Sequence, residues 1–422
     1  MNLEHSQSLE NTLQEIFDLL MSRESQKMNQ YNLKQELNVI HLATSHLGGA
    51  GIAARELNRK LGTKGINSKI VFLDRKQLAT QPNEIKLPRN LWTKIFSYLI
   101  SRINLRLSGT SFFSLLNRSS VDNFFLQEIS SKSHTIIHIH NYYNLISIEQ
   151  IRYLLSLNCK IVLTLHDERF LSGGCHSTID CTQFEIGCVK CPNKKFGVSR
   201  IASSNIIREK IPLLVGSNLK IFAPSRWILD EARRSFLRKD FESVLIPNCL
   251  YSRIISDAKA IGDVVKVGIA SVDPYSQLKG GKLLKELEEL IKSKEHSPLR
   301  LIYMADFNTR TKNDFWSEID VLFVPSLHDN SPNVIHEAKS RGIPIVASKV
   351  GGIPEMLSPD VDKLFNPRLI SPQEIFALIG EFRNTEINMK SIIKMQEDFE
   401  EYLGDPVEKH IMQYLDLLSR FE

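Results

Sequence analysis

The sequence predicts an α/β protein with two doubly wound domains of parallel sheet that face each other across a cleft. Three observations lead to this fold class. Stretches of β-branched and apolar residues alternate with stretches of helical periodicity over most of the 422 residues. A glycine loop, LGGAG, separates the first of these strands from its helix. A connection that contains Pro and Asn, near residues 247–262, divides the alternation into two sets.

The first domain is expected at residues 37–247. It opens with the strand LNVIHLATS, the LGGAG loop, the helix IAARELNRKLGTKG and the strand SKIVFL. This order forms one βαβ unit of a parallel sheet. The later strands are HTIIHIH, CKIVLTL, LKIFAPS and VLIPN, and the later helices are ISIEQIRYLLSLN and SRWILDEARRSFL.

The second domain is expected at residues 248–390. Its strands are VVKVGIAS, LRLIYMA, DVLFVPS and IPIVAS, and its helices are GKLLKELEELIKS and NVIHEAKSR. Two further segments flank the domains. Residues 1–36 are expected to form an N-terminal helical appendage, because apolar residues recur there at helical spacing. Residues 391–422 are expected to form helices that pack back on the first domain.

The composition is that of a soluble globular protein, with 42% apolar and 24% charged residues. A net charge of +5 is small for this length, so we expect no nucleic-acid partner. Residues 1–36 show no apolar stretch of the kind that signal peptides contain, and no run of 18 apolar residues occurs. We therefore expect a cytoplasmic location, in which thiols stay reduced.

The stretch DVLFVPSLHDNSPNVIHEAKSRGIPIVAS contains the main candidate site. Ser331 is expected to cap the helix and Pro332 to take its first position. The next two amide groups would then lack partners and face the cleft, where a helix N-terminus binds phosphate. Two acids flank this helix start and could accept hydrogen bonds from sugar or ribose hydroxyls, or could simply be solvated. The amides are those of Asn333 and Val334, and the acids are Asp329 and Glu337.

The longer stretch SLHDNSPNVIHEAKSRGIPIVASKVGGIPEML resembles the signature of the family 4 glycosyltransferases, whose GT-B fold has two Rossmann-like domains. The resemblance extends over roughly residues 37–420. It implies a hexosyltransferase that moves a sugar, with retention, from a UDP- or GDP-sugar to a glycan or lipid-linked acceptor in polysaccharide or surface glycan biosynthesis. It implies no cofactor for catalysis. The other matching stretches are SHLGGAGIAARELNRKLGTKG, IIHIHNYYN, LTLHDERFLSGGCH, FAPSRWILDEA, VLIPN and LKGG.

The resemblance also implies a role for each candidate residue. These roles fit the chemistry, because a departing nucleoside diphosphate gains negative charge that a cation and helix N-termini stabilise. In the implied assignment Lys279 neutralises the diphosphate and Glu337 holds the donor ribose. Asp329 and the amides of Asn330 and Ser331 contact the donor sugar, and His166 touches the transferred sugar. Gly48 and Gly49 face the diphosphate and acceptor.

Three departures from the family pattern motivate an alternative that ranks below the active enzyme, a catalytically impaired relative that binds nucleotide sugars. Asp329 stands where the family has Glu, and GIASVDPYSQLKGG holds no Arg before Lys279. The stretch from Lys279 to Asp320 is short, as if one helix or strand of the second domain were missing. A dinucleotide-dependent oxidoreductase ranks lower, because LGGAG lacks the G-x-G-x-x-G spacing.

A cysteine-bearing loop is expected at residues 172–192. It ends in C-x-x-C, which is the usual half of a zinc knuckle, so we predict a structural zinc bound by four thiolates. A disulfide pair and unligated thiols are the alternatives. The predicted ligands are Cys175, Cys181, Cys188 and Cys191.

Three other features have weaker interpretations. Residues 89–107 carry an apolar helical stripe with basic neighbours, which favours a helix packed on the first domain over a peripheral contact at the inner face of a membrane. The Asp-x-Asp in PDVDKLF is interpreted as a surface loop. We place His138 and His140 on opposite sides of their strand and favour structural roles for both, with a position of one of them toward the cleft as the alternative.

Overall fold

The computed structural model describes residues 33–420 except 47, 74–82, most of 88–133, 193–197, 211–217, 238–241, 255–258 and 305–308. The helix expected within residues 1–36 and most of the 89–107 segment therefore lie outside the described residues. Among the described residues, no helix combines the length and the apolar character that crossing a membrane requires.

The first domain is built on a seven-stranded parallel sheet in the order β3-β2-β1-β4-β5-β6-β7. All residues of β4 and β5 are buried, as expected for central parallel strands covered on both faces. The strands are β1 (Asn38–Ala43), β2 (Asn67–Leu73), β3 (Glu84–Leu87), β4 (Thr135–Ile139), β5 (Lys160–Thr164), β6 (Leu219–Ala223) and β7 (Glu242–Leu245). The helices are α2 (Gly49–Thr63), α5 (Ile148–Ser156), α6 (Val198–Ser204) and α8 (Arg226–Arg234), with the short η1 (Gln183–Ile186) and η2 (Asn205–Lys210).

The second domain is built on a five-stranded parallel sheet in the order β10-β9-β11-β12-β13. The strands are β9 (Val265–Ile269), β10 (Leu299–Tyr303), β11 (Val321–Val324), β12 (Ile345–Ser348) and β13 (Lys363–Phe365). The helices are α9 (Gly281–Lys292), α10 (Thr309–Glu318), α11 (Asn333–Ser340) and α12 (Pro372–Gly380), with the short η3 (Gln277–Lys279) and η4 (Pro354–Met356). The strands β8 (Lys259–Ala260) and β14 (Glu386–Ile387) precede and follow these elements in the sequence and pair as a two-stranded antiparallel sheet.

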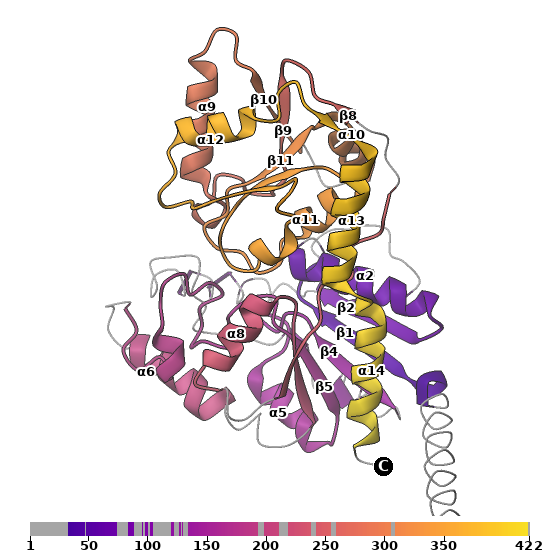
Figure 1. The fold of residues 1–422 in the computed structure, drawn as a ribbon. Coiled ribbons are helices and arrows are strands. Elements are labelled where there is room, and N and C mark those ends of the chain that lie inside the picture. The colour runs from indigo at the N-terminus through magenta and orange to yellow at the C-terminus, as the bar shows by residue number, and fades with distance from the viewer. Residues whose placement is uncertain are drawn as a thin grey trace, which may run out of the picture.

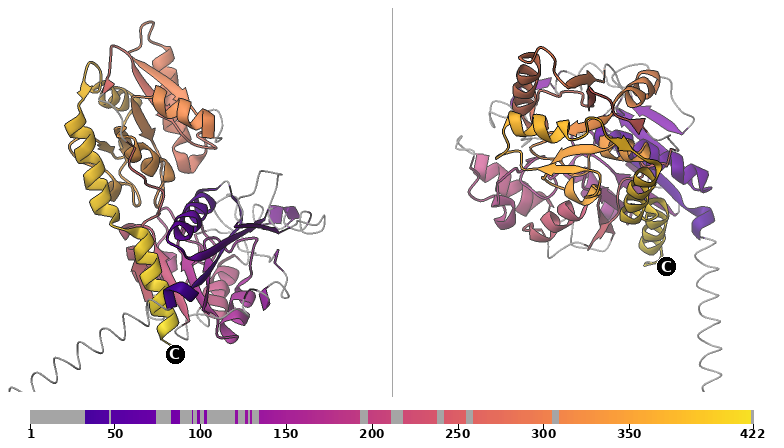
Figure 2. Two further views of the ribbon diagram at one scale, coloured as in Figure 1. Left: turned by 90° about the vertical axis from the view of Figure 1, so that its right-hand side faces the viewer. Right: turned by 45° about the horizontal axis from the view of Figure 1, so that its top comes forward.

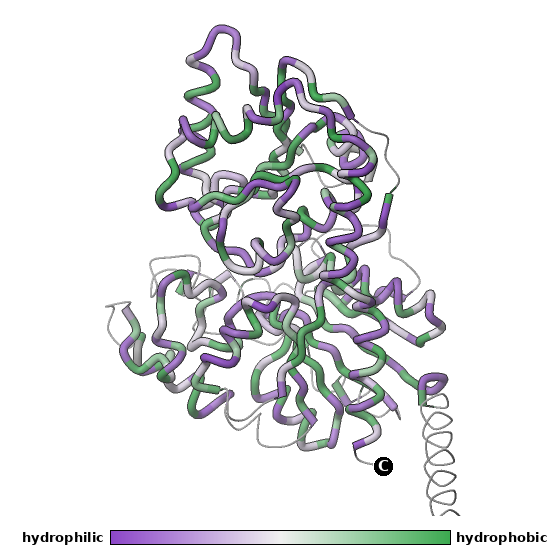
Figure 3. Tube along the Cα trace, viewed as in Figure 1, coloured by the Kyte–Doolittle hydropathy of each residue, from purple (hydrophilic) through white to green (hydrophobic). Residues whose placement is uncertain are grey.

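The predicted fold class is confirmed: two doubly wound α/β domains lie one above the other, with the second domain at the top of Figure 1. In each sheet the strand order reverses at the first strand of the domain, because the next strands in the chain lie on its two opposite sides. In the first domain β1 lies between β2 and β4, and in the second domain β9 lies between β10 and β11. Ligands of open α/β sheets bind beyond the carboxyl ends of the strands at such switch points. Figure 3 shows hydrophobic residues along the strands of both sheets.

The two C-terminal helices, α13 (Met389–Leu403) and α14 (Pro406–Ser419), run along the side of both domains (Figures 1 and 2). Phe399 of α13 belongs to the core of the second domain, whereas Ile411 and Tyr414 of α14 belong to a core of the first. Of the helices that the sequence placed on the first domain, only α14 packs there. Gly404 and Asp405 separate the two helices, and the Asp405 side chain caps α14.

The packing of α14 gives a test of this arrangement. Ile411 is fully buried in the first-domain core, so Ile411→Ala should reduce the stability of that domain by about 2–5 kcal/mol. The neighbouring Met412 is 48% exposed, and Met412→Ala should change stability by no more than about 0.5 kcal/mol. Thermal or urea unfolding of the two variants measures this contrast. Equal effects would mean that α14 does not pack as described.

Candidate functional site

A cavity of about 410 Å³ lies between the two domains. The size suits a small-molecule ligand. Its lining includes all of the predicted catalytic and substrate-binding residues except Gly48, which is the N-cap of α2 and precedes the lining residue Gly49. A larger hollow of about 940 Å³ in the first domain is lined by none of them. The predicted residues in the cleft cavity are Gly49, His166, Lys279, Asp329, Asn330, Ser331, Asn333, Val334 and Glu337.

Lys279 is positioned by a close approach of two backbones. Gly280 has a φ of +73°, and a Cβ at this position would lie 1.9 Å from the carbonyl oxygen of Pro325. Only glycine fits there. The Leu327 amide also donates to the Leu278 carbonyl at 2.8 Å, which holds the LKGG turn against the end of β11. As a result the Lys279 Nζ lies 2.6 Å from Asp329 Oδ2, at the cavity.

The loop that carries Asp329 rests on the two glycines of GGIPE. Gly351 has a φ of +55°, and a Cβ there would lie 1.7 Å from the Asp329 carbonyl oxygen. The Gly352 amide donates to this same oxygen at 3.2 Å. The side chain of Ser326 donates to Asp329 Oδ2 at 3.3 Å. Asp329 is therefore fixed through both its backbone and its carboxylate.

Glu337 is held by two donors from α10. Lys312 Nζ lies 2.9 Å from Glu337 Oε1, and the Trp316 indole Nε1–H donates to Oε2 at 3.1 Å. Lys312 also lines the cavity, so the site contains a second cation although no Arg precedes Lys279. Lys312 was not among the residues predicted from the sequence, because no helix was expected between β10 and β11. The available signal was the spacing of Lys312 and Trp316, which are four residues apart and share a helix face.

The prediction that Ser331 caps α11 is wrong. Pro332 has an extended backbone and is itself the N-cap, and the helix begins one residue later, at Asn333, without a side-chain cap. The Ser331 hydroxyl instead accepts a hydrogen bond from the Asn248 amide at 3.4 Å. The first-turn amides of Asn333 and Val334 have no acceptor within the helix, and both residues line the cavity.

Two asparagines of the second domain contact the first domain beside the cavity. The Asn330 side-chain amide donates to the Leu165 carbonyl at 2.8 Å, and its oxygen accepts from the Ser225 hydroxyl at 2.5 Å. The Asn333 side-chain amide donates to the Gly49 carbonyl at 3.0 Å. These bonds hold the two domains together at the cavity.

Two acids reinforce this contact. Glu355 of the GGIPE segment accepts hydrogen bonds from the amides of Arg226 and Trp227 at 2.9 and 3.1 Å, and so caps α8 of the other domain. Glu168 lies 2.7 Å from His328 Nε2. The stretches FAPSRW and GGIPE, separated by more than a hundred residues, therefore meet at one interdomain contact.

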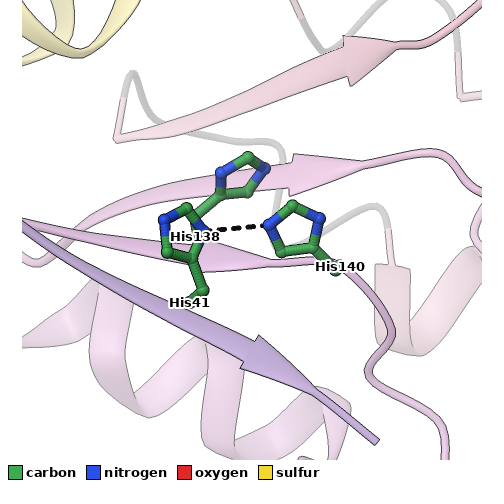
Figure 4. A group of neighbouring side chains, drawn as sticks. All are labelled: His41, His138 and His140. Atoms are coloured by element: carbon green, nitrogen blue, oxygen red, sulfur yellow. Dashed lines mark hydrogen bonds between the residues drawn. The ribbon is translucent and has the colours of Figure 1, made fainter. Parts of the chain in front are cut away.

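His41, His138, His140 and His410 form a buried cluster, part of which Figure 4 shows. The prediction that His138 and His140 face opposite sides of their strand is wrong. Their ring centroids lie 4.0 Å apart, because residues two positions apart on a strand project to the same face. Burial lowers the pKa of His41 to about 3, lowers that of His410 to about 4, and holds that of His138 well below its usual value. These rings are therefore neutral at pH 7.

The interpretation of PDVDKLF as a surface loop is wrong for Asp362. Its carboxylate is buried in an ion pair with Lys339. It also accepts hydrogen bonds from the amides of Ile345 at 2.9 Å and Ser358 at 2.7 Å. The residue joins α11 to the strand that follows it and has a structural role.

The four cysteines of the 172–192 loop form no disulfide. Burial raises the pKa of Cys175 and raises that of Cys188 to about 11. Among the described residues, the one group of three or more potential metal ligands whose donor atoms all lie within 4.8 Å of one another is His41, His138 and His140. The thiols are not gathered into such a group, so zinc binding stays a prediction.

Comparison with known proteins supports the fold. Residues 272–382 match the family described as "Glycosyl transferases group 1". No curated protein matches the chain in sequence. A sucrose-phosphate synthase from Thermosynechococcus elongatus superposes with a TM-score of 0.51 at 12% identity, over 91% of this chain and 97% of that one.

Two other solved structures are similar over the same share of the chain. Anabaena HepE in complex with UDP has a TM-score of 0.51 at 15% identity, over 91% of this chain and 100% of that one. The catalytic domain of Arabidopsis thaliana starch synthase IV, bound to ADP and acarbose, has a TM-score of 0.50 at 14% identity, over 91% of this chain and 99% of that one. The likeness extends across both domains, and the fold is GT-B.

The buried histidines predict a stability that falls in acid. Their folded-state pKa values lie below the unfolded value of about 6.5, so below that pH the unfolded chain binds more protons and the folded state loses stability. Each buried histidine should cost about 2 kcal/mol between pH 6.5 and 5. Thermal melting at the two pH values should show a smaller acid loss for His410→Gln than for wild type. The exposed His296→Gln is the matched control, and an equal loss in both variants would contradict the assignment.

Zinc binding is tested by metal analysis of the purified protein. One zinc per chain is expected, with loss of the metal in Cys188→Ser and in Cys191→Ser but not in Cys249→Ser, whose thiol is buried in another core. Protein purified without a chelator that carries no zinc, or three variants that retain it equally, would disprove the predicted ligand set.

Proposed function

We propose that the chain is a glycosyltransferase that moves a sugar from a nucleoside diphosphate sugar to a glycan or lipid-linked acceptor, with retention of the anomeric configuration. One observation carries the proposal. Lys279 and Glu337, which come from different parts of the second domain, open onto a single cavity that the first domain closes. The match of residues 272–382 to a glycosyltransferase family and the GT-B fold support the same reaction class.

The two lysines of the site suit a diphosphate leaving group. When the bond between the anomeric carbon and the diphosphate oxygen breaks, its electron pair stays on the diphosphate, which gains negative charge. Lys279 Nζ lies at the cavity and is 41% exposed on its side chain, so it can turn from Asp329 to a phosphate oxygen. Lys312 supplies a second cation, and the uncapped N-terminus of α11 adds amide dipoles.

The carboxylates suit the hydroxyl groups of the donor. Glu337 is kept in place by Lys312 and Trp316, and in the proposal it accepts hydrogen bonds from the ribose. Asp329 is shorter than the Glu that the family has, but its loop is packed on Gly351 and its carboxylate faces the cavity from beside Lys279. In the proposal it contacts the transferred sugar, together with His166 from the first domain.

A second candidate is a protein that binds nucleotide sugars without transferring them. The observation in its favour is the charge balance of the cavity. Both lysines of the described lining are already paired with acids, Lys279 with Asp329 and Lys312 with Glu337, and this lining holds no arginine. Transfer requires enough positive charge to stabilise the departing diphosphate, whereas binding requires less.

Thermal shift measurements with UDP-, GDP- and ADP-glucose identify the donor, because a ligand that binds the folded state raises the melting temperature. With that donor, Lys279→Ala should lower kcat/KM by about 10²–10³, as expected for loss of a group that stabilises the transition state. Glu337→Ala and Lys312→Ala should each lower it by about 10–100-fold, through loss of a charged hydrogen bond. Lys282→Ala removes the same charge from the fully exposed start of α9 and should have no effect.

The two candidates give different results. Binding of a nucleotide sugar without turnover, in an assay with a lipid-linked or oligosaccharide acceptor, would favour the binding protein. An active wild type that is insensitive to both Lys279→Ala and Glu337→Ala would refute the proposed site. The anomeric configuration of the product, read from its proton coupling constants, decides whether the reaction proceeds with retention.

A further inference from the structure

A chain of hydrogen bonds leads from the cavity into the core of the first domain. His166, which lines the cavity, places Nε2 at 3.0 Å from Nδ1 of His140. The Nε2 atom of His140 lies 3.0 Å from Nδ1 of His41, the contact drawn in Figure 4. The Nε2 atom of His41 lies 3.1 Å from the hydroxyl oxygen of Ser68, and this hydroxyl donates to Asn58 Oδ1 at 2.7 Å.

The protons of this chain can be placed one by one, starting at its buried end. Asn58 Oδ1 can only accept, so the single hydroxyl proton of Ser68 is used there. The Ser68 oxygen must then accept from His41, which requires an Nε2–H on that ring. A neutral imidazole has one N–H, so Nδ1 of His41 is an acceptor.

The order of protons continues to the cavity. Because His41 Nδ1 accepts, the hydrogen bond that reaches it comes from Nε2–H of His140. His140 Nδ1 therefore accepts from Nε2–H of His166. This leaves Nδ1 of His166 as a lone-pair acceptor, and the described residues provide no hydrogen-bond donor to it.

This order of protons requires neutral rings, and the surroundings of the hydrogen-bonded chain keep them neutral. His41 and His140 are fully or almost fully buried, and burial lowers the pKa of both well below 6.5. The pKa of His166 is lowered to about 4 by the same cause. No acid is hydrogen-bonded to any of the three rings among the described residues. The charge of Asp167 raises the pKa of His166, but burial outweighs it and keeps the ring neutral.

We propose that Asn58, Ser68, His41 and His140 act as positioning residues for His166, holding it as the Nε2–H tautomer so that its Nδ1 presents an acceptor to a hydroxyl group of the bound sugar. The identity of that ligand as a sugar rests on the function proposed above. The chain makes the site selective. A sugar that lacks the hydroxyl would leave the fixed acceptor without a partner, which costs affinity.

Metal binding by the same histidines is the competing explanation, because His41, His138 and His140 lie close enough together to share an ion. Every ring nitrogen of these three residues already has a hydrogen-bond partner. His138 is bonded to the Tyr414 hydroxyl and the Thr164 hydroxyl, both at 2.7 Å. A metal would have to replace several buried hydrogen bonds at once, so the geometry favours the hydrogen-bonded chain.

The test is the tautomer of His166, read from long-range proton–nitrogen NMR spectra of the whole chain labelled with ¹⁵N-histidine at pH 7.5. The His166 signals are identified by their absence in His166→Gln. The expected pattern is a protonated Nε2 and an unprotonated Nδ1. A protonated Nδ1, an averaged pattern, or signals of a metal-bound ring in the cluster would each overturn the proposal.

Variants at the buried end then test the coupling. Ser68→Ala removes the hydroxyl that fixes His41, and Asn58→Ala removes the acceptor that orients Ser68. Either variant should turn the single His166 tautomer into a mixture. Tyr414→Phe is the matched control: it removes the hydroxyl bonded to His138, outside the chain, and should leave the His166 pattern unchanged. A pure Nε2–H pattern in both alanine variants would show that the chain does not position His166.

This readout needs no substrate, so it separates the two proposals. A single Nε2–H tautomer in a protein without transferase activity would support the positioning role of the chain and disprove the proposed function. Transfer activity together with a mixture of His166 tautomers would support the proposed function and disprove the positioning role.

Discussion

The site depends on the packing of one loop, residues 326–332, between β11 and α11. The loop packs on Gly351, which has no side chain and therefore lets the backbone of Asp329 lie against its own backbone. It is fixed from the second domain by the LKGG turn, and from the first domain by the bonds of Asn330 to Leu165 and Ser225. Both acids of the site and the N-terminus of α11 take their positions from this loop, so a shift of the loop would displace all of them together.

The charges in the cavity are arranged in pairs that a ligand can rearrange. Lys279 is close enough to Asp329, and Lys312 to Glu337, that each lysine compensates an acid while no diphosphate is bound. A diphosphate would compete for the two lysines and leave the acids to accept hydrogen bonds from hydroxyl groups. This exchange keeps the desolvation cost of these four charges low in both states, because each of them has a partner.

Much of the fold followed from the sequence because strand and helix periodicities alternate clearly, and the position of the site followed from the glycines and acids near residue 329. Local patterns failed where the decisive partner is distant in sequence. Lys312 acquires its role from Glu337 on another helix, and Asp362 is buried by its pairing with Lys339. The error at His138 and His140 had a different origin. It came from a misapplied strand period, since neighbours two apart share a face.

The histidine cluster connects the cleft to the end of the chain. Tyr414 of α14 donates or accepts a hydrogen bond at His138 Nδ1, and the His410 ring lies 5.8 Å from that of His138. α14 therefore excludes water from the side of the cluster that faces away from the cavity. Without this cover the rings would be solvated and their pKa values would rise toward 6.5, so that neutral and charged forms would coexist near neutral pH. The order of protons in the chain from Asn58 to His166 requires neutral rings, and so the last helix of the sequence helps to define the chemistry of a site formed mainly by loops of the two sheets.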